Sequence, residues 1–281
     1  MSSEYLHSYL QLEIITGILT PPWIHTSKAT LSDTPNPQEE IWRKKTTQVL
    51  KEFFIRLNKE ILPKSFIEIG AHEASISVEL KRQGVPTVHA IEANPFVFNK
   101  YKADLNNSGI KYLNFAVSNT NNEVEISIPL FSEVLDRADG SLLKRTADAN
   151  YKTVKVLSKK LSNHIQDEQL DDISIWIDTE GLTLEVIKSA EPLLDRVMLI
   201  HAEVEDINYW KDQDGVLEVF KYLFENNFVA IARDMDGRGQ YNVIFANQKY
   251  MNKLGGLISD YWKDLSALKN QNNARKKLKF F

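Results

Sequence analysis

The chain has 281 residues, a formal net charge of −4 at pH 7 and no cysteine. The absence of cysteine excludes disulfides, thiolate zinc sites and cysteine nucleophiles, and the acidic balance argues against a dedicated nucleic-acid binder, which would favour a basic face. Hydrophobic residues make up 43% and charged residues 26%, which fits one large α/β domain with an appendage. No apolar run approaches about 18 residues and no secretory signal pattern is seen, so we expect no membrane span and a cytoplasmic protein.

The first 60 residues are expected to form an N-terminal helical extension. Apolar residues recur at helical spacing over 4–19, and Pro21 stops that helix. The stretch 26–38 is rich in Ser, Thr, Pro and Asn and indicates a linker or a lid. Residues 41–57 predict an amphipathic helix whose basic residues form a solvated face.

A core domain is expected over 61–250, where apolar strands and amphipathic helices alternate. Strands are predicted at 66–69, 88–91, 110–117, 123–130, 151–157, 173–177, 197–204, 228–232 and 241–246. Helices are predicted at 74–82, 95–106, 161–165 and 216–224, and a further helix after Gly181 contains Leu184, Val186 and Ile187. The Asn121-Asn122 turn predicts an edge hairpin that joins the third and fourth strands. The stretch 131–150 has no clean period and is a candidate acceptor loop. Residues 251–281 predict a helical tail with a basic end, best explained as solvated.

The turn after the first strand indicates which kind of nucleotide is bound. Glu92 ends the second strand about 20 residues beyond Gly70, where an acidic residue accepts ribose hydroxyls in doubly wound folds. A dinucleotide site needs further glycines, but His72 and Ala74 stand at those positions. A ligand with ribose and no phosphate fits better, and S-adenosylmethionine is one, with an acidic rim from Glu68 and Glu73. Alternatively, Glu92 and Glu73 are solvated carboxylates favoured by helix dipoles.

Residues 65–95 resemble the first two motifs of class I S-adenosylmethionine-dependent methyltransferases, and more narrowly the chain resembles the FkbM family. The residues that carry the resemblance are Glu68-Ile69-Gly70-Ala71-His72-Glu73, Ala90-Ile91-Glu92-Ala93-Asn94-Pro95, Asn114-Phe115-Ala116-Val117-Ser118, Asp178-Thr179-Glu180-Gly181 and Glu203-Val204. Ala74 departs from the family pattern, which usually has glycine there. The resemblance covers roughly 65–247. It implies a doubly wound, seven-stranded, mostly parallel sheet with an inserted last strand, and O-methyl transfer, often to sugar or polyketide hydroxyls.

The geography of such folds assigns cofactor contacts by position. The turn from Gly70 to His72 would border the methionine part, Glu92 the ribose, and Ala93 and Asn94 the adenine edge. Ala116 and Val117 would cover the adenine face. The full expected cofactor set is Glu68, Gly70, Ala71, His72, Glu73, Ser75, Glu92, Ala93, Asn94, Ala116, Val117 and Asp178.

The acceptor chemistry is expected at the ends of the strands 173–177 and 197–204, where Asp178 and Glu203 lie. An alcohol needs a base or a metal that lowers its pKa before it attacks a methyl group. Asp178, Glu180 and Glu203 are the expected catalytic residues, because clustered carboxylates can raise one another's pKa and make a general base. Alternatively, Asp178 and Glu203 hold Mg²⁺, which commonly uses one or two carboxylates with waters.

Four residues are candidates for binding the acceptor. Ser141 and Arg145 lie in the 131–150 loop, where Arg145 suits an anionic group and an ordinary surface turn is the alternative. His201 and Glu205 lie on the strand that carries Glu203. A packed histidine and a solvated carboxylate are the simpler explanations for those two.

The sequence therefore predicts an S-adenosylmethionine-dependent O-methyltransferase that acts on a hydroxyl of a carbohydrate or related small metabolite. Two alternatives stay open. One is a non-catalytic binding module on the same scaffold, since fold does not fix function. The other is an NAD-dependent oxidoreductase, against which His72 counts. The expected partner is a small-molecule or glycan acceptor rather than nucleic acid, with a homo-oligomer left open.

Overall fold

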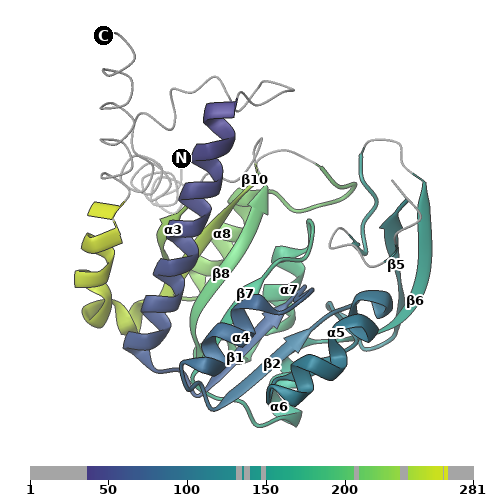
Figure 1. Cartoon of the computed structure of the whole chain (residues 1–281), viewed down its shortest axis with the longest axis horizontal. Helices are drawn as coiled ribbons and strands as arrows, with labels where there is room; N and C mark the ends of the chain where they lie inside the picture. Colours follow the sequence, from purple (N-terminus) through teal and green to yellow (C-terminus); the bar gives the residue numbers. More distant parts are fainter. Residues whose placement is uncertain are drawn as a thin grey trace.

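The computed structural model describes residues 37–130, 135, 140–146, 150–205, 209–234, 240–261, 263 and 264. Within them, a seven-stranded sheet has the order β3-β2-β1-β7-β8-β10-β9 (Figure 1). Its strands are β1 (Ser65–Ile69), β2 (Thr87–Ile91), β3 (Lys111–Leu113), β7 (Ile173–Ile177), β8 (Val197–Glu205), β9 (Phe228–Arg233) and β10 (Gln240–Asn247). The pairs from β3 across to β8 are parallel, whereas β10 runs antiparallel to β8 and β9. The predicted seven-stranded, mostly parallel sheet with an inserted last strand is confirmed.

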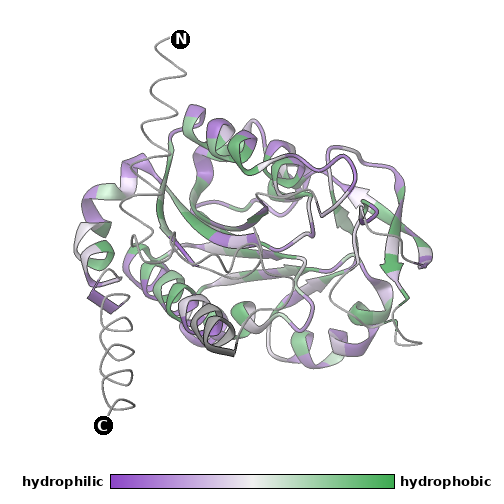
Figure 2. Cartoon of the chain, turned by 90° about the horizontal axis from the view of Figure 1, so that it is seen from above, coloured by the Kyte–Doolittle hydropathy of each residue, from purple (hydrophilic) through white to green (hydrophobic). Residues whose placement is uncertain are grey.

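Helices cover both faces of this sheet. The helices α6 (Leu161–Asp167), α7 (Thr183–Ser189) and α8 (Val216–Glu225) pack on one face, and α3 (Pro37–Ile61), α4 (Ser75–Arg82) and α5 (Pro95–Asn107) on the other. Short 3-10 turns, η2 (Leu193–Arg196) and η3 (Gln248–Tyr250), flank β8 and β10. Figure 2, seen from above, shows the sheet between its helical layers. Because it is covered on both faces, β8 is buried along its whole length, with His201, Glu203 and Glu205 included.

The described part of α3 is a structural layer. Its Phe53, Phe54 and Leu57 are fully buried, and Phe54 meets Trp176 of β7 edge-on at 5.4 Å between ring centroids. Tyr261, in the helical segment 251–261, stacks on Phe53 at 4.6 Å. Both segments thus share one apolar cluster with the sheet. The predicted first helix lies outside the described residues, and the domain limits at 60 and 250 stay predictions.

The prediction for residues 110–130 is partly wrong. The stretch expected as one strand is divided between β3 in the large sheet and β4 (Ala116–Val117) in a three-stranded sheet of order β4-β6-β5. In that sheet, β5 (Glu123–Pro129) pairs with β6 (Tyr151–Lys159) and does not form the expected hairpin with 110–117. The cause lies in the packing, because alternate apolar residues of β5 meet those of β6 in a cluster of their own. No helix in the described ranges is both long and apolar enough to cross a membrane.

A buried pair of histidines joins the sheet to α6. Nδ1 of His89 on β2 lies 2.9 Å from Nε2 of His164, and both side chains are almost fully buried. Burial lowers the pKa of each imidazole to about 4. The pair is therefore held neutral in the folded chain at neutral pH.

This pair predicts a loss of stability in mild acid. Below about pH 6.5 the unfolded chain protonates these histidines and the folded chain does not, so the free energy of unfolding falls as pH decreases toward about 4. Each histidine contributes about 2 kcal/mol of loss between about pH 7.5 and about pH 5. We expect His164→Gln to lose clearly less stability than the unmodified chain over this range in urea titrations. Buried carboxyls with raised pKa act in the opposite direction in both proteins and so cancel. Equal losses would contradict this role of the pair.

Candidate active site

The turn after β1 can hold only glycine at its first position. Gly70 has φ +74, and a Cβ added there would lie 1.7 Å from the carbonyl oxygen of Asp178. The N–H groups of Gly70 and Ala71 both donate to the carbonyl of Ile91 at the end of β2. The turn therefore joins the ends of three strands, and the close approach that requires glycine is made by protein backbone.

Glu68 supports this turn from beneath. Ala74 precedes α4 in a left-handed conformation and caps it with no side chain. The buried carboxylate of Glu68 on β1 instead accepts the N–H of Ser77 at 2.7 Å, satisfying an otherwise orphan donor of the helix start. Burial raises the pKa of Glu68 to about 7, against the opposing effect of its bonds to Ser77. The structure does not bring Glu68 to an exposed acidic rim; Glu73 and Ser75 are the exposed residues of this turn.

Glu92 follows β2, and its carboxylate connects the turn after β1 to the start of α5. One carboxylate oxygen accepts the N–H of His72 at 2.8 Å and the other the N–H of Asn94 at 2.7 Å. Burial raises the pKa of Glu92 to about 7, while both N–H donors lower it. Each oxygen of a carboxylate has two acceptor positions. Glu92 therefore keeps acceptor capacity on both oxygens.

Tyr112 and Asn114 also hold this region, and the sequence did not point to them individually. The hydroxyl of Tyr112 donates to the carbonyl of His72 at 2.6 Å. The amide of Asn114 donates to the carbonyls of Glu92 and Ala93 at 2.7 and 3.1 Å. His72 has φ 45, so these bonds fix a left-handed residue at the predicted cofactor position.

The remaining predicted cofactor residues lie near the end of β2. Asn94 caps α5 by accepting the N–H of Phe96, and its amide donates to the carbonyl of Leu135. Ala93 packs against the small cluster that contains Ala116. Val117, next to Ala116 in β4, packs into the apolar cluster on the face of the large sheet that α6, α7 and α8 cover. Their predicted contacts with adenine stay predictions.

Three carboxylates gather where β7 and β8 end. Oxygens of Asp178, Glu180 and Glu203 all lie within 4.8 Å of one another. The N–H of Asp178 donates to the carbonyl of Ile69, so this acidic cluster directly adjoins the Gly70 turn. Gln240 donates to the carboxylate of Glu203 at 2.7 Å. The parallel order of β1, β7 and β8 thus brings the predicted catalytic residues together.

Glu205 borders the same cluster from a buried position. Its side chain is 4% exposed, and burial followed by the charge of Asp178 raises its pKa to about 7, against a bond from the N–H of Gly181. One oxygen, Oε1, has no hydrogen-bond partner in the described part of the chain. Glu205 is therefore a buried group, in contrast to the solvated carboxylate that was the simpler explanation from sequence.

The other predicted acceptor residues fall in different places. Ser141 lies beside the cluster, because its hydroxyl donates to the carbonyl of Glu180 at 2.8 Å. The guanidinium of Arg145 lies over the ring of Trp210, 4.8 Å from its centroid. His201 is buried and stacks on Trp176 at 3.3 Å between centroids, on the α3 face of the sheet. The structure thus shows the packed histidine and does not bring His201 to the acidic cluster.

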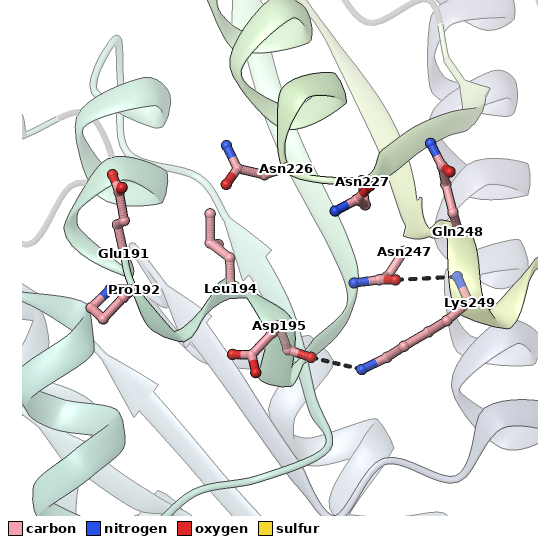
Figure 3. A pocket seen from close by; sticks show the side chains of 9 residues that line it. All are labelled: Glu191, Pro192, Leu194, Asp195, Asn226, Asn227, Asn247, Gln248 and Lys249. Atoms are coloured by element: carbon pink, nitrogen blue, oxygen red, sulfur yellow. Dashed lines mark hydrogen bonds between the residues drawn. The ribbon is translucent and has the colours of Figure 1, made fainter.

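A separate pocket of about 470 Å³, lined mostly by residues of polar types, lies at the opposite edge of the sheet, where β8 and β9 begin (Figure 3). Lys249 spans it to the carbonyl of Asp195, and the amide of Asn247 accepts the N–H of Lys249. These groups satisfy local backbone atoms. The pocket contains none of the predicted site residues.

Comparison with known families decides between the possible assignments of this scaffold. The model of the "Methyltransferase FkbM domain" matches residues 68–230, which is more than half of the chain. The chain belongs to the FkbM methyltransferase family. The matched range of this FkbM domain contains the Gly70 turn, Glu92 and all three carboxylates of the acidic cluster.

Among solved structures, the FkbM chain is similar to several methyltransferases at low identity. It shares 12% identity with precorrin-6y C5,15-methyltransferase from Geobacter metallireducens, covering 65% of this chain and 78% of that one, with a TM-score of 0.35. It shares 13% identity with the ribosomal protein L11 methylase from Lactobacillus delbrueckii subsp. bulgaricus, covering 72% of this chain and 78% of that one, with a TM-score of 0.39. It shares 9% identity with TrmK of M. capricolum in complex with S-adenosyl-homocysteine, covering 66% of this chain and 62% of that one, with a TM-score of 0.37. Among curated proteins, the sequence has no match.

Proposed function

We propose that this FkbM-family chain transfers a methyl group from S-adenosylmethionine to a hydroxyl of a carbohydrate or related small metabolite. The observation that carries the proposal is that the candidate cofactor site directly adjoins the candidate catalytic carboxylates. The Gly70 turn and Glu92 form a shelf suited to a nucleoside, and the acidic cluster of Asp178, Glu180 and Glu203 adjoins that shelf through the Ile69–Asp178 hydrogen bond.

The donor groups of the shelf fit S-adenosylmethionine. Glu92 retains acceptor capacity on both oxygens for the two ribose hydroxyls. Carboxylates of the acidic cluster offer negative charge to a cationic sulfonium and ammonium. The left-handed His72, whose N–H is already bonded to Glu92, leaves no glycine-lined approach for a pyrophosphate. This argues against an NAD-dependent oxidoreductase.

Methyl transfer to a hydroxyl requires the protein to remove the hydroxyl proton and to align the hydroxyl with the methyl group. When bound, the cofactor supplies an electrophilic methyl group on a cationic sulfur. A carboxylate of the acidic cluster, with Asp178 nearest the Gly70 turn, would accept the proton of the acceptor hydroxyl, so that the hydroxyl oxygen could take up the methyl group that the cofactor would supply. Glu180 and Glu203 orient the hydroxyl or share its proton.

The same oxygens also suit a divalent cation, which is the second reading of this cluster. The oxygens of Asp178, Glu180 and Glu203, all within 4.8 Å of one another, form a donor set of the kind that Mg²⁺ accepts. A bound Mg²⁺ would lower the pKa of the acceptor hydroxyl. Asp178 and Glu203 are the residues we expect to hold it.

Chelation separates a general base from a metal. We expect the methyl-transfer rate to change less than twofold in excess EDTA, because a cluster carboxylate serves as the base. A fall of more than about tenfold that is restored by Mg²⁺ and not by Na⁺ would instead support the metal. The control is the affinity for S-adenosylmethionine, measured with and without chelator.

Transfer itself tests the proposal. The chain is incubated with S-adenosylmethionine labelled on its methyl group and a panel of monosaccharides, oligosaccharides and small alcohols. Label in an ether of one acceptor class supports O-methyl transfer. Cofactor binding without label in any acceptor of a panel that also includes amines and thiols would favour a non-catalytic module.

A further inference from the structure

Ser141 is held in a fixed position beside the acidic cluster. Its N–H and carbonyl both pair with those of Ser127 on β5, at 3.1 and 2.7 Å. The side chain is 3% exposed, and its hydroxyl accepts the N–H of Leu143 at 3.0 Å while donating to the carbonyl of Glu180. The hydroxyl therefore has a donor and an acceptor partner within the protein and is not free for a substrate.

The residue that Ser141 holds has an unfavourable backbone. Glu180 has φ 48, a left-handed conformation that a residue with a Cβ adopts only when its surroundings enforce it. Gly181 follows with φ +86. Two successive left-handed residues bend the chain sharply after β7, and this bend directs the carboxylate of Glu180 toward Asp178 and Glu203.

Trp210 covers the same turn from the other side. A Cβ on Gly181 would lie 2.6 Å from Cδ1 of Trp210, whose side chain is 1% exposed. Trp210 forms an isolated bridge with Arg145, and the flanking bonds Thr146 N–H to Tyr209 and Lys211 N–H to Lys144 extend it. The 140–146 segment thus supports the 178–181 turn in two ways, directly through the Ser141 hydrogen bond and indirectly through Trp210.

We propose that Ser141 is a positioning residue that holds the Glu180 turn in its left-handed conformation and so connects the 140–146 segment to the acidic cluster. This rests on the proposed function and changes the role of Ser141 from a substrate contact to a support for Glu180.

The test compares Ser141→Ala with Ser127→Ala. The control removes a hydroxyl from Ser127, the residue paired with Ser141, which is 4% exposed and bonds to Ser141 through its main-chain N–H and carbonyl. Hydrogen–deuterium exchange of peptides spanning 178–182 is expected to be at least tenfold faster in Ser141→Ala and within twofold of the unmodified chain in Ser127→Ala. In the methyl-transfer assay, kcat should fall at least tenfold in Ser141→Ala, with KM for S-adenosylmethionine within threefold.

Equal exchange in the two variants, or an unchanged kcat in Ser141→Ala, would overturn the positioning role. The two proposals fail in different ways. If the unmodified chain bound no S-adenosylmethionine, the proposed reaction would be rejected, and the exchange comparison would still decide whether Ser141 holds the turn.

Discussion

Gly70→Ala is expected to prevent the chain from folding stably or to reduce its free energy of unfolding by about 3–5 kcal/mol. The added Cβ would lie 1.7 Å from the carbonyl oxygen of Asp178 and 2.8 Å from its carbonyl carbon, at a residue with φ +74. Both clashing atoms are backbone, so relief requires β1 and β7 to separate at their ends. Urea or thermal unfolding measures the loss, and any folded fraction should also lose affinity for S-adenosylmethionine.

Gly109→Ala is the matched control, because the φ angle of Gly109 is almost the same as that of Gly70, but a Cβ there would meet no backbone atom. Gly109 has φ +76, and its nearest neighbour would be the flexible Cε of Lys81 at 3.3 Å. We expect a loss of about 1–2 kcal/mol there, from the left-handed conformation alone. Similar losses for the two variants would show that the contact with Asp178 is not what requires glycine at position 70.

Asp178→Asn is expected to reduce kcat for methyl transfer by about 10² to 10⁴-fold, the usual contribution of a general base. The change keeps the size of the side chain and removes the charge that faces the other carboxylates of the acidic cluster. Affinity for S-adenosylmethionine should fall by less than about tenfold, because Glu92 is retained. Steady-state kinetics on the best acceptor of the panel and calorimetry with the cofactor separate the two effects.

Asp171→Asn makes the same chemical change at the other end of β7. Asp171 is exposed and precedes the strand that Asp178 follows. We expect its kcat to lie within twofold of the unmodified value. An Asp178→Asn variant as active as this control would remove Asp178 from the chemistry and shift the assignment to Glu180 or Glu203.

The sequence predicted the parts of the fold and site that depend on local pattern and strand order. Apolar runs that end in Gly70, Glu92 and Asp178, and a run that ends just beyond Glu203, place these residues near the carboxyl ends of parallel strands, which meet at one edge of a sheet. The gathering of Asp178 and Glu203 followed from that rule and is confirmed by the structure. The identity of the base within the cluster stays a prediction.

Features that depend on packing between distant segments could not be predicted. The period of two in β5 and β6 was visible, but it does not say which strands pair. Glu68 belongs to the family motif, yet its direction depends on α4, whose capping residue, Ala74, supplies no side-chain acceptor. Trp210 was missed because its role depends on facing Gly181. The only local signal was a large aromatic in a polar segment.

Calorimetric titration with S-adenosylmethionine tests the central claim most directly, namely that the Gly70 turn and Glu92 form a cofactor shelf. We predict saturable binding of one cofactor per chain, weakened by about 1–3 kcal/mol in Glu92→Ala through the loss of charge-assisted hydrogen bonds. Glu123→Ala, which removes an exposed carboxylate from β5, should bind normally, and circular dichroism should show both variants folded. Absence of binding to the unmodified chain at millimolar cofactor, or equal affinity of Glu92→Ala and Glu123→Ala, would contradict the account.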